Sequence, residues 1–218
     1  MTDIRALVVN TSVGRNGTSQ APAELRATPD GALYTAELGL STGIEGRTFA
    51  AHMGQITTPL TTAVTTALSN TTPHAWVRVP DGTVIIPIYA RITFEGSGAT
   101  TQGEISIWIA QNDIGNGTSS AASSGIISLN TAAPVTSSCT ARQLATAATT
   151  APTNPLELTR FSVAAASAPN TSYEWDAETL GIYPVIRGAG SWAICIGGNA
   201  ITYFAQMVWQ EFTEVSLS

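Results

Sequence analysis

The chain contains no lysine, only two cysteines and two histidines, and few charged residues of any kind. Charged residues make up 11% of its 218 residues, less than half of the roughly 25% typical of soluble domains. The nine basic residues are all arginines, scattered singly along the chain, and the net charge is -6. Phosphate neutralisation provides much of the affinity of nucleic-acid-binding proteins. The absence of a basic cluster therefore argues against DNA, RNA or an anionic membrane as a direct partner.

Long apolar runs are also missing. None approaches the roughly 20 residues that a membrane-spanning helix needs. The N-terminal residues Met1–Arg5 lack the charged and apolar regions of a secretory signal. We therefore expect a protein that is synthesised in a cytoplasm and that stays there or leaves by a route such as lysis.

The local motifs of common active sites do not occur. There is no G-x-S-x-G, no P-loop and no G-x-G-x-x-G. His52 and His74 have no second ligand at zinc-site spacing, which favours ordinary strand-end residues. Cys139 and Cys195 permit one disulfide, but a loop thiol and a buried small residue are favoured. We expect no catalytic residues, no cofactor and no small-molecule substrate, and thus no enzyme, although a Ser-His-Asp triad leaves no local trace.

The strongest positive signal is one long alternating strand, from Val84 to Phe94. Pro87 interrupts it and marks an edge or a bulge, because proline cannot donate to a sheet ladder. The apolar face is predicted to contain Val84, Ile86, Ile88, Ala90, Ile92 and Phe94. The opposite face becomes polar toward the end of the strand, as expected for a half-solvated strand.

Further strand signals follow one another without βαβ alternation. Asp81-Gly82 predicts one hairpin, and Gly197–Asn199 predicts a second at the end of the chain. Residues Ala141–Ala148 could hold a short helix or nothing regular. Eight to ten strands predict an all-β, antiparallel β-sandwich, and a jelly roll is its commonest eight-stranded form. The predicted strands include Arg47–Met53, Ala75–Val79, Glu104–Ala110, Ile126–Leu129, Glu157–Ala165, Ser172–Asp176, Ile182–Arg187, Trp192–Ile196 and Ala200–Val215.

Residues 1–45 differ from the sandwich domain predicted over 46–218. They have few periodic apolar positions and read as an extended N-terminal arm that needs a neighbouring surface. Over residues 1–30, three arginines balance three acidic residues. The candidate interface residues in the arm are Ile4, Leu7, Val8 and Val9.

Two polar patterns in the sequence are candidates for metal sites. Glu174, Asp176 and Glu178 alternate, so in a strand they would lie on one face, roughly 7 Å apart. Such a row could bind Ca²⁺ or act as an acid/base pair, but a solvated edge is the favoured interpretation. Asn112–Gly117 is superficially like a calcium loop but lacks its frame, which favours a plain turn. The five tryptophans fit core or interface packing better than sugar stacking.

Three stretches resemble structural proteins of tailed bacteriophages: Glu45–Phe49, Val79–Pro87 and Tyr173–Asp176. The resemblance implies a virion component with a jelly-roll or related fold, assembled as a ring or trimer, and it carries no catalytic residues. Because the chain is acidic and its arm neutral, we expect a capsid decoration or cement protein on the capsid surface, bound to itself and to other capsid proteins. The alternatives are a shell-forming capsid protein and a carbohydrate-binding module of a fibre or tail.

Overall fold

The computed structural model describes residues 42–43, 45–55, 57–61, 68–95, 103–144, 149–163, 171–198 and 202–214. The predicted arm lies outside these ranges apart from Thr42, Gly43 and Glu45. Its candidate interface residues, Ile4, Leu7, Val8 and Val9, are among those not described. Within the described ranges, no helix has the length and apolar character to cross a membrane.

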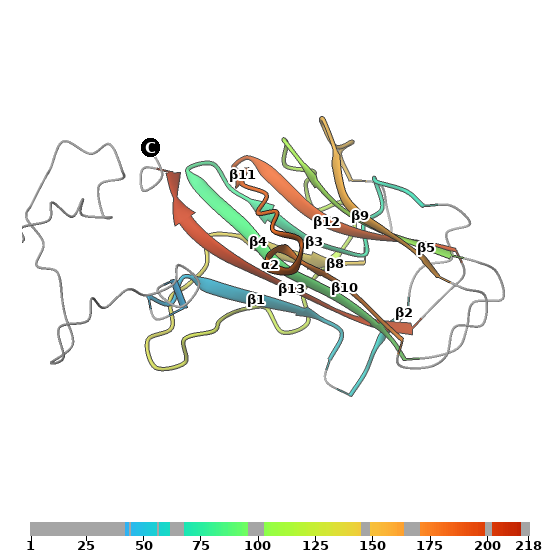
Figure 1. The fold of residues 1–218 in the computed structure, drawn as a ribbon, viewed down its shortest axis with the longest axis horizontal. Coiled ribbons are helices and arrows are strands. Elements are labelled where there is room, and N and C mark those ends of the chain that lie inside the picture. Colours follow the sequence, from blue (N-terminus) through green and yellow to red (C-terminus); the bar gives the residue numbers. More distant parts are fainter. Residues whose placement is uncertain are drawn as a thin grey trace, which may run out of the picture.

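Two antiparallel sheets pack face to face, which confirms the predicted all-β sandwich (Figure 1). The first has the strand order β10-β4-β13-β1-β7, with β11 beside β4 and β2 beside β13. The second has the order β6-β8-β3-β12-β5-β9. The first sheet comprises β1 (Thr48–Met53), β2 (Leu60–Thr61), β4 (Thr83–Phe94), β7 (Ile126–Ser128), β10 (Ser172–Asp176), β11 (Ile186–Arg187) and β13 (Thr202–Thr213). The second comprises β3 (Ala75–Val79), β5 (Gly103–Ala110), β6 (Ser120–Ala121), β8 (Thr140–Gln143), β9 (Leu156–Val163) and β12 (Gly190–Gly197).

The eight principal strands pair in a nested pattern. In chain order the first pairs with the last, the second with the seventh, the third with the sixth and the fourth with the fifth. The four pairs are β1 with β13, β3 with β12, β4 with β10 and β5 with β9. A chain doubled back on itself in this way makes every principal pairing long-range, including the innermost one, where Ile109 lies opposite Leu156.

Both predicted hairpins are therefore wrong. A turn does form at Pro80–Gly82, where the amide of Thr83 donates to the carbonyl of Pro80 at 3.2 Å. However, β3 and β4 belong to opposite sheets, as do β12 and β13. Turn residues determine that the chain reverses locally. They do not determine whether the next strand pairs with the previous one or crosses to the facing sheet.

The predicted single apolar face of β4 is only half right, because the strand contains a bulge. Tyr89 lies opposite Val208 and Pro87 lies opposite Trp209, so Ile88 is the extra residue. The bulge reverses the alternation: before it Ile85 faces the core, and after it Ala90, Ile92 and Phe94 do. This confirms the bulge predicted from Pro87 and moves Ile86 and Ile88 out of the core.

The second sheet is covered on both faces. Its inner residues join those of the first sheet in the main core, which holds Trp192, Ile194 and Ile196 of β12. Ala193 and Cys195 of the same strand belong to a second, smaller cluster on the outer face. Strand β12 is accordingly buried at all eight positions. The possible helix at Ala141–Ala148 is wrong where the structure describes it, because Thr140–Gln143 forms β8 against β3.

Candidate functional site

His74 immediately precedes β3 and is only 4% exposed. Its Nδ1 accepts a hydrogen bond from the amide of Ile196 at 3.0 Å, and its carbonyl accepts one from the Tyr203 hydroxyl at 3.1 Å. Burial lowers the pKa of the imidazole to about 4, so the ring is neutral at pH 7. These two hydrogen bonds connect His74 to β12 of the second sheet and to β13 of the first sheet. The role of His74 is therefore structural.

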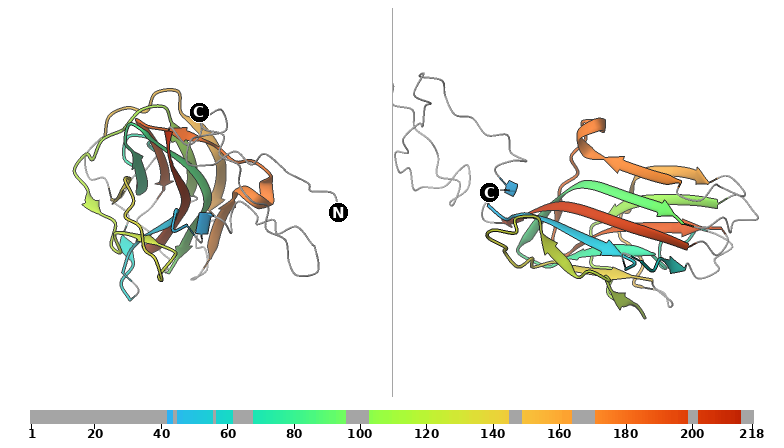
Figure 2. Two further views of the ribbon diagram at one scale, coloured as in Figure 1. Left: turned by 90° about the vertical axis from the view of Figure 1, so that its left-hand side faces the viewer. Right: turned by 90° about the horizontal axis from the view of Figure 1, so that it is seen from below.

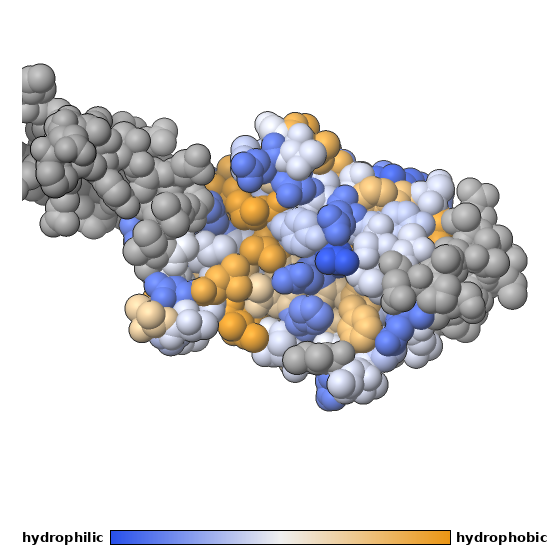
Figure 3. Space-filling view, turned by 60° about the horizontal axis from the view of Figure 1, so that its bottom comes forward, coloured by the Kyte–Doolittle hydropathy of each residue, from blue (hydrophilic) through white to orange (hydrophobic). Residues whose placement is uncertain are grey.

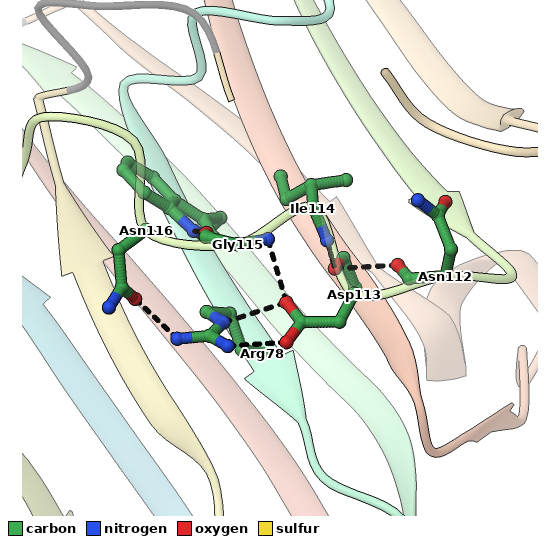
Figure 4. A network of polar contacts seen from close by, with 8 residues as sticks. Arg78, Asn112, Asp113, Ile114, Gly115 and Asn116 are labelled. Carbon is green, nitrogen blue, oxygen red and sulfur yellow. Dashed lines mark hydrogen bonds and ion pairs between the residues drawn. The ribbon is translucent and has the colours of Figure 1, made fainter. Parts of the chain in front are cut away.

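A clamp of polar residues fixes a loop to the outer face of the second sheet (Figure 4). Arg78 of β3 donates through Nε to Oδ1 of Asp113 at 2.7 Å and through a second nitrogen to Oδ2. It also donates to the side chain of Asn116. The amide of Gly115 donates to the same aspartate at 2.8 Å. These hydrogen bonds, those from Arg78 first, lower the pKa of Asp113, and the aspartate in turn raises that of Arg78.

The same loop closes the second core cluster. The side chain of Ile114 is fully buried, and its amide donates to Oγ of Ser191 at 3.1 Å. The indole of Trp76 donates to the carbonyl of Gly115 at 3.1 Å. The carboxylate of Asp113 is engaged by Arg78 rather than open to a cation. The interpretation of Asn112–Gly117 as an ordinary loop therefore agrees with its contacts.

Both cysteines are buried and free. Cys195 accepts a hydrogen bond from the Trp108 indole at 3.2 Å, and burial raises its pKa to about 12. Cys139 lies in the bend just before β8, as predicted for a loop thiol, and it is buried in the main core, where burial raises its thiol pKa. A thiol held protonated is a poor nucleophile. Neither cysteine is poised for reaction in this arrangement.

The acidic row proposed as a calcium candidate does not exist as a row. Glu174 lies in β10 and pairs with Arg91, with 3.4 Å between Oε1 and Nε. The strand ends at Asp176, whose Oδ1 caps helix α2 (Ala177–Leu180) by accepting from the amide of Thr179 at 3.0 Å. Glu178 is a residue of that helix. No group of three or more potential metal ligands occurs among the residues that the structure describes.

All five tryptophans are buried, as predicted. Their exposed fractions run from 0 to 4%, in Trp76, Trp108, Trp175, Trp192 and Trp209. Trp175 of the first sheet meets Trp192 of the second edge to face, with 6.1 Å between ring centroids. None of them is available as a stacking platform for a sugar. The two features on which the carbohydrate hypothesis depended are therefore missing.

A hollow of about 520 Å³ lies on the second sheet, lined by apolar residues such as Trp108 and Cys195 and by polar ones such as Ser106 and Glu157. Ser106 there donates to Oε2 of Glu157 at 2.7 Å. Arg160 also donates to that carboxylate, and its hydrogen bonds are the main reason that the pKa of Glu157 is lowered. A carboxylate stabilised in this way is a weak base toward the serine hydroxyl. The hollow has polar groups but no activated one.

The outward face of the first sheet carries alternating rows across its strands. One row aligns Ile127, Ala50 and Val208, and the next includes Arg91 and Glu174. Figure 3 views this side of the molecule and shows apolar and polar areas next to each other. Apolar surface is thus available on the sheet, but it is broken by charge.

Large apolar side chains that are about half exposed gather in two places. Patch A comprises Leu156, Leu180, Ile182, Tyr183 and Val185, and patch B comprises Ile127, Leu129 and Val135. Patch A borders a hollow of about 720 Å³ that both Leu156 and Val185 line. Of the strand predicted over Ile182–Arg187, only Ile186–Arg187 forms one. The signal that was missed is an apolar run outside any strand.

A scan against protein-family models found no match for the chain. A search of the curated proteins found none, and neither did a search of the solved structures.

Proposed function

We propose that the chain is a structural protein that decorates the assembled capsid of a tailed bacteriophage and acts by binding rather than by chemistry. The observation that carries the proposal is the contrast between its interior and its surface. The buried and half-buried ionisable groups discussed above serve structural contacts, whereas large apolar side chains stand exposed in patches A and B. Exposed apolar patches mark interaction sites on soluble proteins.

The strand arrangement supports a jelly roll. Nested pairing of eight strands in two four-stranded sheets, β1-β13-β4-β10 and β3-β12-β5-β9, is the arrangement of a doubled-over antiparallel ribbon. Capsid proteins and lectins are among the proteins built on it. The resemblance of three segments to phage structural proteins favours the first of these.

The charge of the chain supports a place on the outside of the capsid. With a net charge of -6 and no lysine, the protein would be repelled by packaged DNA. A decoration protein that binds the assembled shell and not its free subunits stabilises the shell by mass action.

Deletion of residues 1–30 tests the proposal. Particles assembled with the shortened chain should lose it during sedimentation or break at a lower temperature than particles carrying the full chain. Thr61→Glu is a matched control, because Thr61 is exposed in β2, outside both patches, and should leave binding unchanged. Equal binding by the full and shortened chains would contradict a role for the arm.

A shell-forming capsid protein is the second candidate, because a jelly roll suits it equally. Expression of the chain alone discriminates between them. A shell former gives large closed particles visible by electron microscopy, whereas a decoration protein gives a small oligomer.

A further inference from the structure

We propose that copies of this chain associate head to tail, with patch A of one copy packed on patch B of the next. The inference rests on one part of the proposed function, that copies associate with one another, and it does not depend on binding to a virion. All eight large hydrophobic residues that are exposed among the described residues belong to one patch or the other.

The two patches lie at opposite edges of the first sheet. Strand β10 is one end of its strand order, and Leu180–Val185 follows that strand directly through α2. Strand β7 is the other end and carries Ile127, with Leu129 and Val135 just after it. Figure 2, in its left view, places α2 and the segment around β7 on opposite sides of the sandwich. Different surfaces on opposite sides produce a heterologous contact, which closes into a ring if the rotation permits.

The combined apolar area of patches A and B matches the apolar area buried in a stable protein–protein interface. At roughly 100 Å² for each half-exposed large apolar residue, the two patches together offer about 800 Å², close to the apolar share of a standard interface of about 1,600 Å². Residues 126–138, which contain patch B, include no charged residue. Docking an apolar patch there requires no charge in this segment to be desolvated.

The first described residues of the chain lie beside patch B. Gly46 packs so closely that a Cβ there would lie 3.1 Å from Cγ2 of Val135. Thr42 accepts a hydrogen bond from Nε2 of Gln210 at 2.7 Å. The 41 residues before Thr42 can extend at most about 140 Å. A neighbour docked on patch B would lie beside the start of this segment and within its reach.

Patch A also offers a shape for the contact. Leu180, Ile182 and Tyr183 belong to a connection that projects beyond β10, while Val185 and Leu156 line the adjacent hollow. Patch B instead lies on strand β7 and the loop that follows it, so the two patches are built from different elements.

A mixing experiment with two single-patch variants tests the proposal. Ile182→Glu places a charge in patch A and Leu129→Glu places one in patch B. By analytical ultracentrifugation of the full chain, the wild type should form a species larger than a dimer, and each variant alone should be monomeric. An equimolar mixture should give a species of two chains and nothing larger, because one intact A and one intact B remain.

The controls keep the result interpretable. Thr61→Glu adds the same charge outside both patches and should assemble like the wild type. Unchanged circular dichroism and melting temperature establish folding, and Val185→Ser with Val135→Ser provides a milder pair. A mixture that stays monomeric, a single variant that assembles normally, or a monomeric wild type would overturn the inference. A wild-type ring that fails to bind particles would contradict only the proposed function.

Discussion

The neutral imidazole of His74 makes the sandwich sensitive to acid. Its folded pKa of about 4 lies below the ordinary value of 6.5, so protonation favours the unfolded chain. The stabilisation is complete above pH 6.5 and is lost as the pH falls toward 4. At 1.36 kcal/mol for each pKa unit, the free energy of unfolding should fall by about 3 kcal/mol across that window.

Urea unfolding at pH 7 and at pH 4.5 measures this loss. His74→Asn keeps an acceptor for the Ile196 amide but cannot become charged, so its stability should be lower at pH 7 and nearly flat down to pH 4.5. His52→Asn is the matched control and should keep the wild-type slope. Equal slopes for the wild type and His74→Asn would show that another group carries the acid sensitivity.

The clamp between Arg78 and Asp113 is the second feature that a single substitution can probe. The two side chains are 25% and 32% exposed, so the pair is only partly screened by solvent. Asp113→Asn leaves the arginine without its charged partner and should lower the free energy of unfolding by about 1–3 kcal/mol. Hydrogen exchange at the Ile114 amide should also accelerate, because the loop that positions this amide is released.

A weak surface pair provides the comparison. Glu45 and Arg47 are 46% and 41% exposed, with 3.2 Å between Oε2 and Nε. Glu45→Gln should therefore have no measurable effect on stability or on exchange at Ile114. If Asp113→Asn is equally silent, the loop is held by the burial of Ile114 and by the hydrogen bonds of Ser191 and Trp76.

At the scale of elements, alternation within the sequence predicted where strands lie but not what they pair with. Thr48–Met53, Ala75–Val79 and Ser172–Asp176 were predicted to within a residue, because the alternation that identifies a strand is local. The partners of these strands are distant in the chain, and turn chemistry at Pro80–Gly82 does not encode them. Pairing with β3 likewise makes Thr140–Gln143 a strand, although these residues overlap the stretch Ala141–Ala148 in which a short helix was possible.

The candidate site was less predictable than the fold for the same reason. Arg78 and Asp113 are 35 residues apart and have no local signature that links them. The acidic alternation of Glu174, Asp176 and Glu178 was visible in the sequence, but the capping of α2 by Asp176 ends the strand and separates the carboxylates. The Ile182–Val185 part of patch A was missed because a short apolar run reads as a strand, although Pro184 interrupts it.

The bulge in β4 leads to a prediction about chain length. Because Ile88 is the unpaired residue, deleting it should restore a continuous ladder and leave Ile85 and Ile92 facing the core. Deleting Ala90 instead removes a core residue. To keep Ile92 inward, the ladder would have to close the bulge and turn Tyr89 into the core. The first deletion should keep the fold, whereas the second should lower the unfolding midpoint far more or prevent folding.

Circular dichroism and urea midpoints of the two deletion variants provide the test. Both lose one residue from the same strand, so they are matched in length and position. Comparable damage from both deletions would mean that the bulge is required for the twist of the sheet rather than being an insertion the fold can lose.

At the scale of the whole molecule, the distribution of charge and apolar surface predicts how copies should respond to salt. Each chain carries a net charge of -6, and patch B lies in a segment without charged residues. Approaching copies therefore repel one another overall, while the contact itself is apolar. Raising NaCl from 50 to 500 mM screens the repulsion and should strengthen association by roughly two- to fivefold.

Temperature separates the two contributions, because apolar association weakens on cooling. Sedimentation equilibrium at 5 and 25 °C, at both salt concentrations, should therefore show the tightest association in the warm, high-salt sample. Thr61→Glu lies away from the patches and makes the net charge more negative, about -7. It should therefore steepen the salt dependence of association without abolishing assembly. An interface built on ion pairs would behave in the opposite way, since salt would weaken it. Association that falls with added NaCl would thus exclude an apolar contact between patches A and B.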